Sequence, residues 1–392
     1  MNVRTGRFRL LDSMRAIAFV SVLAAHAAFP AGFAADGSTL RPFFARLDVG
    51  VRIFFLISAF LLYRPFVAAR LGGEEPPLVR AYAWRRFLRV APAYWLALCV
   101  IGLWVGAPGV FTVEHAPLYF GFAHIYDTQT LNVRGMPQAW SLCVEVSFYV
   151  FLPLYAAILR RVAGGLRTEL VGAAVLFGLG LAYKLWVFTM GPVTDVSLLR
   201  WHLALPEYID YFAIGMALAA VSVSGAGGRV VDLVARRPWV AWLSAAVLFV
   251  VVSKGIGLSG GVHDHVTEAR YLARHYLYGA IALGVLLPAI FGDPEEGLIR
   301  RVLAWRPLLW IGLVSYGAYL YHFVVIEQLA DRGFRPIAAD TSPYLWFPVA
   351  LACSLAIAAV SWYWFERPLL SFKRLVPRRP VERGEAKLEP AP

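Results

Sequence analysis

Long apolar runs separated by short polar segments recur along the whole chain. A helix that rises 1.5 Å per residue needs about 20 apolar residues to cross a hydrocarbon layer of about 30 Å. Ten windows approach or reach this length: 11–30, 49–67, 87–106, 140–159, 169–190, 203–222, 239–253, 270–291, 308–329 and 344–365. The pattern predicts an all-α polytopic membrane protein with about ten transmembrane helices.

Composition supports a membrane protein over a soluble enzyme. Hydrophobic residues make up 59% of the 392 residues and charged residues 16%, whereas soluble domains average about 45–50% and about 25%. The net charge of +12 does not indicate a nucleic-acid partner, because the arginines lie between the apolar windows, where membrane topology places them.

The distribution of Lys and Arg predicts the orientation. With a cytoplasmic N-terminus, the inner segments hold 24 Lys and Arg and the outer segments hold 8. Cytoplasmic loops carry the excess of these residues. We therefore expect a multi-pass protein of the inner or plasma membrane with both termini in the cytoplasm.

The termini suggest one membrane domain and no attached catalytic domain. The start MNVRTGRFRL leads into an apolar run without a small-residue cleavage site, so it is interpreted as the approach to the first span. Residues 1–371 are expected to form the transmembrane domain. Residues 372–392 are rich in proline and charge, and we expect a disordered basic cytoplasmic tail.

The three cysteines do not indicate a disulfide framework or a metal site. Cys99, Cys143 and Cys353 all lie inside apolar windows and lack the repeated spacing of metal ligands. They are interpreted as small core residues.

Ionisable residues inside the windows converge on one depth. Each costs about 2.5–3.5 kcal/mol at the centre of a span. Counted along the helices, His26, Lys184 and His322 lie roughly 21–22 Å from the cytoplasmic boundary, and Glu145 lies roughly 7–8 Å below the outer boundary. The same outer third holds Glu207, Asp210 and Arg274. Any one of these residues alone could be a helix–helix hydrogen-bonding partner, but the layer as a whole predicts a water-accessible cavity.

Arg15 and His26 lie on one face of the first predicted helix. Eleven positions separate them, which is about three turns and about 16.5 Å. The cation lies near the cytoplasmic mouth and the imidazole lies deep. This arrangement suits a donor with an anionic head in the cytosol and a reactive group that reaches inward to a histidine able to accept a proton. Taken alone, Arg15 is better interpreted as an ordinary positive-inside anchor that snorkels to the interface.

A second basic cluster lies at the start of the third predicted helix. The segment RRFLRVAPAYW carries Arg85, Arg86 and Arg89 ahead of an aromatic pair. Guanidinium groups bind phosphates in bidentate fashion, so the cluster is a candidate site for a nucleotide-bearing thioester. The competing interpretation is a topology signal beside an aromatic belt.

Several segments together resemble the membrane-bound acyltransferase 3 family, which includes bacterial O-acyltransferases of surface glycans and macrolide acyltransferases. The resemblance rests on LDSMRAIAFVSVLAAHA (11–27), VGVRIFFLISAFLLYRPF (49–66), RRFLRVAPAYW (85–95), WSLCVEVSFYVFLPLY (140–155), YIDYFAIGMALA (208–219), SYGAYLYHFVVI (315–326) and FERPL (365–369). Their order and spacing cover almost the whole chain. Two positions depart from the family pattern: Ala59 follows Ser58 in place of glycine, and Arg52 replaces an acidic residue.

The resemblance implies an acyltransferase that uses acyl-CoA, expected to be acetyl-CoA, from the cytoplasmic side, with no tightly bound cofactor and no metal. The implied acceptor is a hydroxyl of a carbohydrate or a glycosylated or lipid-linked molecule of the cell envelope. The implied catalytic residues are His26, Glu145 and Arg15. The candidate substrate-binding residues are Arg85, Arg86, Arg89, Ser58, Trp140, Ser141, Tyr319 and His322.

The expected mechanism places Glu145 against His26, where it would orient the imidazole and stabilise its charged form. His26 would either deprotonate the acceptor hydroxyl or take the acyl group itself and pass it on, and the sequence leaves both routes open. The competing classes are a secondary transporter with a buried proton or ion relay and an inactive membrane scaffold. A transporter of this kind is expected to have an inverted repeat or paired broken helices, and the sequence shows neither.

Overall fold

The structure is a computed structural model that describes residues 8–28, 30–31, 39–131, 134–192, 195–256, 267–332 and 342–376. Within these ranges the chain is helical and forms no strand. Ten long helices correspond to the ten predicted spans: α1 (Leu10–Ala27), α3 (Gly50–Leu71), α4 (Val79–Trp104), α6 (Trp140–Arg160), α7 (Leu166–Phe188), α9 (Leu205–Ser224), α11 (Pro238–Val250), α12 (Glu268–Ile290), α14 (Arg306–Asp331) and α15 (Ser342–Ser361).

Nine helical stretches among the described residues are long and apolar enough to cross a membrane. The long helix outside these nine is α3, whose 22 residues include Arg52, Arg64 and Arg70. The prediction of an all-α polytopic membrane protein is confirmed.

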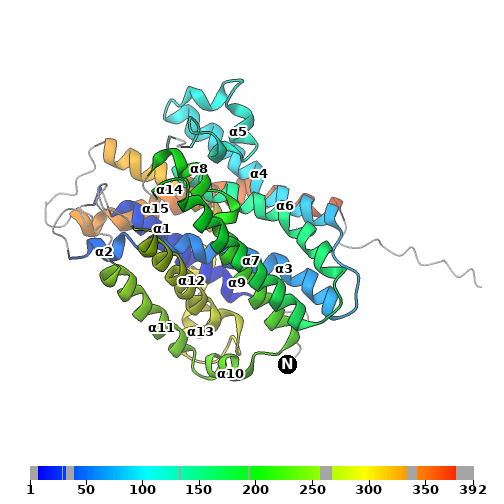
Figure 1. The fold of residues 1–392 in the computed structure, drawn as a ribbon. Helices are drawn as coiled ribbons and strands as arrows, with labels where there is room; N and C mark the ends of the chain where they lie inside the picture. Colours follow the sequence, from blue (N-terminus) through cyan, green and yellow to red (C-terminus); the bar gives the residue numbers. More distant parts are fainter. Residues whose placement is uncertain are drawn as a thin grey trace, which may run out of the picture.

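Short helices mark the two ends of the bundle. α5 (Ala116–Phe120) and α8 (Leu199–His202) lie at one end, and α10 (Gly228–Arg236) and α13 (Leu298–Leu303) lie at the other (Figure 1). α7 and α9 run between these two ends. We call the end with α10 and α13 the inner end, because the charge distribution predicts that it is cytoplasmic, and the opposite end the outer end.

α1 and α3 occupy the centre of the bundle. α1 packs against α3 and α14, α3 packs against α9, and α9 packs against α7. Aromatic rings fill the space between α3, α6 and α9: Phe148 and Phe212 stack with their centroids 4.1 Å apart, and Phe55 stacks on Phe212 at 5.0 Å. Outward-facing residues such as Leu154 and Leu179 remain exposed, as expected for helices that face lipid.

α4 begins eight residues before the predicted span. Arg80, Arg85 and Arg86 lower the hydropathy of this segment, so an apolar window excludes it. Arginine and alanine are nevertheless good helix formers, and the backbone continues as helix. The early turns of α4 therefore place arginines at the inner end of the bundle.

The first residues of the predicted tail are ordered. A 3-10 turn at Leu370–Leu375 packs on α4, where Trp84 Nε1 donates to the carbonyl of Phe372 at 3.0 Å and Arg85 Nη2 donates to the carbonyl of Val376 at 3.3 Å. This corrects the expectation of disorder from residue 372, since these hydrogen bonds fix the backbone. Residues 377–392 of the predicted tail lie outside the described residues.

Candidate active site

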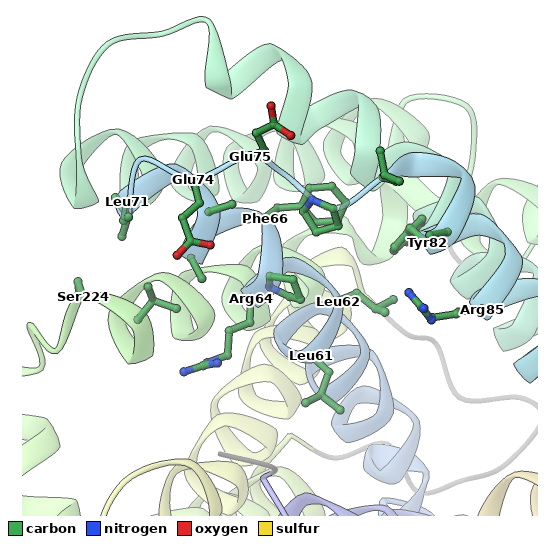
Figure 2. A pocket seen from close by; sticks show the side chains of 18 of the residues that line it. Leu61, Leu62, Arg64, Phe66, Leu71, Glu74, Glu75, Tyr82, Arg85 and Ser224 are labelled. Carbon is green, nitrogen blue, oxygen red and sulfur yellow. The ribbon is translucent and has the colours of Figure 1, made fainter. Parts of the chain in front are cut away.

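A large cavity opens at the inner end of the bundle. Its volume is about 830 Å³, and α3, the start of α4 and the segment that joins them form most of its wall. Figure 2 shows Arg64 on α3 and Arg85 on α4 at two sides of this cavity, with Glu74 and Glu75 on the joining segment. We call it the entrance cavity. Ligand cavities are typically about 300–1,000 Å³, so the entrance cavity is large enough for a cofactor-sized molecule.

A second cavity lies deeper between the helices. Its volume is about 220 Å³, and Leu61, Leu62 and Arg86 line both this cavity and the entrance cavity. The two cavities therefore adjoin. On α3 the deep cavity is lined from Leu62 up to Val51, which corresponds to about 16 Å along the helix axis. Together the cavities form a path from the inner end toward the outer half of the bundle.

Seven of the eleven predicted site residues line the deep cavity. They are Arg15, Ser58, Arg86, Arg89, Ser141, Glu145 and Tyr319. Five different helices contribute these residues: α1, α3, α4, α6 and α14. Arg85 lines the entrance cavity instead.

The arginines of the deep cavity differ in their partners. Arg15 forms an ion pair with Asp12 at 2.8 Å, and Arg89 lies 3.7 Å from Glu366. Arg86 has no hydrogen bond or ion pair with the described residues, and it is half-buried where the two cavities meet. A cation in this position is available to an anionic ligand.

Glu145 is held inside the deep cavity by two hydroxyl groups. Ser58 Oγ donates to Oε1 at 2.8 Å, and Tyr149 OH donates to Oε2 at 2.9 Å. Tyr149 also lines the cavity but was not among the predicted residues. The signal was present, because a residue four positions after Glu145 lies on the same face of a helix.

His26 and His322 form a directly bonded pair between α1 and α14. His26 Nδ1 lies 2.9 Å from His322 Nε2, and His322 Nδ1 lies 2.8 Å from the carbonyl oxygen of Tyr319. The Tyr319 ring packs on His322 at 5.5 Å, and its hydroxyl shares a hydrogen bond with Ser141 Oγ at 2.8 Å. Because Tyr319 also lines the deep cavity, it is the contact between that cavity and the histidine pair.

The partner of His26 differs from the expectation. We expected Glu145 to orient the imidazole, but its carboxylate is occupied by Ser58 and Tyr149, and His322 bonds to His26. The reason is the order of the helices, since α1 packs along the length of α14. Trp140 packs on Tyr208 with centroids 5.2 Å apart and is not among the lining residues of the deep cavity.

The ionisable residues that were predicted to form one layer do not share one cavity. Lys184 Nζ lies 2.8 Å from Asp210 Oδ2, and His275 Nε2 lies 2.9 Å from the same oxygen. Nearby, Tyr271 OH donates to Glu207 Oε1 at 2.7 Å. This group lies between α7, α9 and α12 and lines neither cavity described above. Equal depth in the membrane therefore did not mean a shared cavity.

Cys143 and His124 pack together beneath the outer end. Cys143 Sγ lies 3.4 Å from His124 Nδ1, and both side chains are buried. Burial lowers the pKa of His124 to about 4, so the imidazole is neutral at physiological pH. The described residues contain no group of three or more His, Cys, Asp or Glu side chains suited to hold a metal ion.

The fold and the site define a multi-pass membrane protein with a basic path that leads from one end of the bundle to Tyr319, which packs on the hydrogen-bonded pair of His26 and His322. Neither histidine is among the residues that line the two cavities. The profile of the acyltransferase domain family (acyltransferase 3) matches residues 8–363, and the chain belongs to this family.

The chain is similar to three curated relatives. It is 24% identical to peptidoglycan O-acetyltransferase OatA of Listeria monocytogenes, over 92% of this chain and 55% of the relative. It is 24% identical to nodulation protein 10 of Rhizobium leguminosarum, over 84% of each chain. It is 22% identical to acyltransferase MdmB of Streptomyces mycarofaciens, over 92% of this chain and 89% of the relative. The chain spans about half the length of the peptidoglycan O-acetyltransferases it matches. No solved structure matches it.

Proposed function

We propose that this chain transfers an acyl group, with acetyl as the first candidate, from acyl-CoA to a hydroxyl of a carbohydrate or glycosylated acceptor. Family membership supports acyl transfer as the reaction type. The names of relatives that act on peptidoglycan support a carbohydrate acceptor. The donor would enter from the cytoplasm, and both termini would lie on that side.

The observation that carries the proposal is the pair of adjoining cavities with Arg86 where they meet. A CoA thioester has an anionic nucleotide head and a narrow, uncharged arm that carries two amide groups. The entrance cavity offers room and guanidinium groups for the head. The smaller deep cavity begins at Leu61 and Leu62 and continues to polar groups such as Ser58 and Ser141, which suit the arm. Arg86 would contact the phosphates, since it is the cavity arginine without a partner among the described residues.

The reactive end of the donor would arrive near Tyr319. The Tyr319 hydroxyl, bonded to Ser141, is a candidate donor to the oxygen of the thioester carbonyl. His26 would act as general base toward the acceptor hydroxyl or as a nucleophile that carries the acyl group. Glu145 would keep the hydroxyl groups of Ser58 and Tyr149 in place in the channel.

The first test is the loss of transfer in His26→Ala. Membranes containing the wild-type protein, given radiolabelled acetyl-CoA and cell extract, should release free CoA and label an acceptor or the protein. His26→Ala should fold to the same extent and show no transfer above membranes without the protein. Wild-type activity in this variant would contradict the assignment of His26.

The second test concerns the donor. Arg86→Ala should raise the KM for acetyl-CoA by about tenfold, equivalent to about 1.4 kcal/mol, and leave kcat unchanged. Arg80→Ala is the matched control, because Arg80 is exposed on the same helix and lines neither cavity. An unchanged donor KM in Arg86→Ala would exclude its role in phosphate binding.

The transporter alternative would use the buried group of Lys184, Asp210 and His275. Both carboxylate oxygens of Asp210 already have partners: His275 contacts both, and Lys184 contacts Oδ2. This saturation favours a structural role for the group. Uptake of a labelled solute that depends on Lys184, without release of CoA, would instead support the transporter.

A further inference from the structure

We infer that His322 is a positioning residue that holds His26 in the tautomer with an unprotonated Nε2. This inference rests on the proposed function for its catalytic consequence, but the tautomer itself is a property of the folded chain. The geometry that carries it is a chain of hydrogen bonds running from a backbone carbonyl through two imidazole rings.

The carbonyl fixes the first proton. The oxygen of Tyr319 accepts hydrogen bonds and has no proton to donate, so His322 Nδ1 must carry the hydrogen of the 2.8 Å contact. A neutral imidazole protonated at Nδ1 has a lone pair at Nε2. His322 Nε2 is therefore the acceptor of its contact with His26.

The second proton follows from the first. His26 Nδ1 lies 2.9 Å from His322 Nε2, and two lone pairs do not attract, so His26 Nδ1 must be the donor. A neutral His26 then leaves Nε2 unprotonated. This nitrogen is the one that can accept a proton or attack a carbonyl carbon.

The surroundings of His322 support its neutral form. The side chain is fully buried, with the ring of Phe19 at 6.1 Å and that of Tyr319 at 5.5 Å. His322 has no ion pair with the described residues, and a charge buried without a counterion is costly. His26 is less buried than His322, and Phe323 packs edge-on against it at 5.4 Å.

The locked tautomer defines the proton balance of transfer by the base route. His26 Nε2 takes the proton of the acceptor hydroxyl, and the acceptor oxygen forms a bond to the acyl carbon. The carbon–sulfur bond breaks, and the departing thiolate receives that proton from Nε2. While Nε2 is protonated, the charge on His26 is stabilised through its Nδ1–H hydrogen bond to His322 Nε2.

Two variants separate positioning from simple packing. His322→Phe keeps a ring of similar shape but removes the acceptor, whereas His322→Gln offers an amide oxygen in its place. We expect His322→Phe to lower kcat by about 100-fold or more with the donor KM changed by less than about twofold, because the substrate contacts remain. His322→Gln should recover at least about ten times the kcat of His322→Phe.

The tautomer can be measured without turnover. In wild-type protein labelled with ¹⁵N-histidine, the ring of His26, assigned among the eight histidines by comparison with His26→Ala, should show a protonated Nδ1 and an unprotonated Nε2. His322→Phe should give a mixture of tautomers at His26.

The outcomes distinguish the inference from the proposed function. A protonated Nε2 on His26 in the neutral wild-type ring would overturn the inference even if the enzyme is active. So would a wild-type kcat in His322→Phe, a His322→Gln variant no better than His322→Phe, or a loss confined to KM. If the tautomer is as stated but no acyl transfer is found with acetyl-CoA, the proposed function fails while the inference about the histidine pair stands.

Discussion

Gly312 of α14 lies directly against the backbone of α1. A Cβ atom added at Gly312 would lie 1.7 Å from the carbonyl oxygen of Asp12 and 2.4 Å from its carbonyl carbon. An ordinary contact begins at 3.4 Å. Because the obstacle is backbone, no side chain can rotate away, and Gly312→Ala must push the two helices apart by about 1.7 Å.

This separation acts directly on the candidate site, because α1 carries His26 and α14 carries His322. If the helices shift as rigid bodies, the Nδ1–Nε2 distance lengthens from 2.9 Å to about 4.6 Å, which is beyond a hydrogen bond. We expect Gly312→Ala to lose about 1–3 kcal/mol of stability from overpacking. Its kcat for transfer should fall by about 100-fold, the lower end of what a positioned base contributes.

Gly178→Ala on α7 is the control. A Cβ at Gly178 meets nothing within 4 Å, and alanine is favoured over glycine in a helix interior by about 0.5–1 kcal/mol. Both variants are assayed for transfer and for thermal unfolding in the same detergent. Gly178→Ala should keep wild-type kcat and unfold at the same or a higher temperature. A wild-type kcat in Gly312→Ala would refute either the close helix approach or the need for the histidine contact.

Three further predictions concern stability. Arg300 is buried in α13, and its guanidinium donates to five backbone carbonyls. Arg300→Lys should lower the free energy of unfolding by at least about 3 kcal/mol, because an ammonium cannot reach them all. An unfolding temperature within one degree of wild type would exclude this role. Lys184→Met should lower the free energy of unfolding by about 3–5 kcal/mol, because it removes the cation that pairs with the buried Asp210. Adding Asp210→Asn should recover part of the loss, and no recovery would show that the pair is not coupled. Burial lowers the pKa of His124 from 6.5 to about 4, so the unfolded state takes up a proton on this ring at a higher pH than the folded state. The contribution of His124 to stability should be complete above about pH 6.5 and fall by about 3 kcal/mol as the pH drops to about 4. His124→Phe should lack this step when unfolding is measured against pH.

The sequence predicted the helices well because each span must satisfy the same length and polarity requirement. The predicted boundaries failed where polar residues continue a helix beyond the apolar window, as in α4, where Arg80 and Arg85 precede the predicted start. The early residues of the tail were also misjudged. Their hydrogen bonds to Trp84 and Arg85 join residues almost 300 positions apart, and no local pattern encodes such a contact.

The sequence predicted how deep the site residues lie in the membrane, but it did not predict which residues contact one another. Counting residues along a helix gives a height, and His26 and His322, placed at nearly the same height, are indeed bonded. The height of a residue does not show which helices are neighbours. Lys184 was therefore grouped with the two histidines, although it pairs with Asp210 where α7 packs on α9. For the same reason Glu145 was assigned to His26, while its oxygens accept from Ser58 and Tyr149.

The distance between the arginines and the histidine pair has a kinetic consequence. Arg86 lies where the cavities meet and Tyr319 lies at the far end of the deep cavity, beside His322. In the proposed reaction a donor would have to contact both regions in one bound geometry, and charge would change only at the histidine end. Interactions that are equal in the bound and transition states alter KM alone, whereas those that form with the developing charge alter kcat. The two ends of the path should therefore separate kinetically, with Arg86 acting on KM and the histidine pair on kcat.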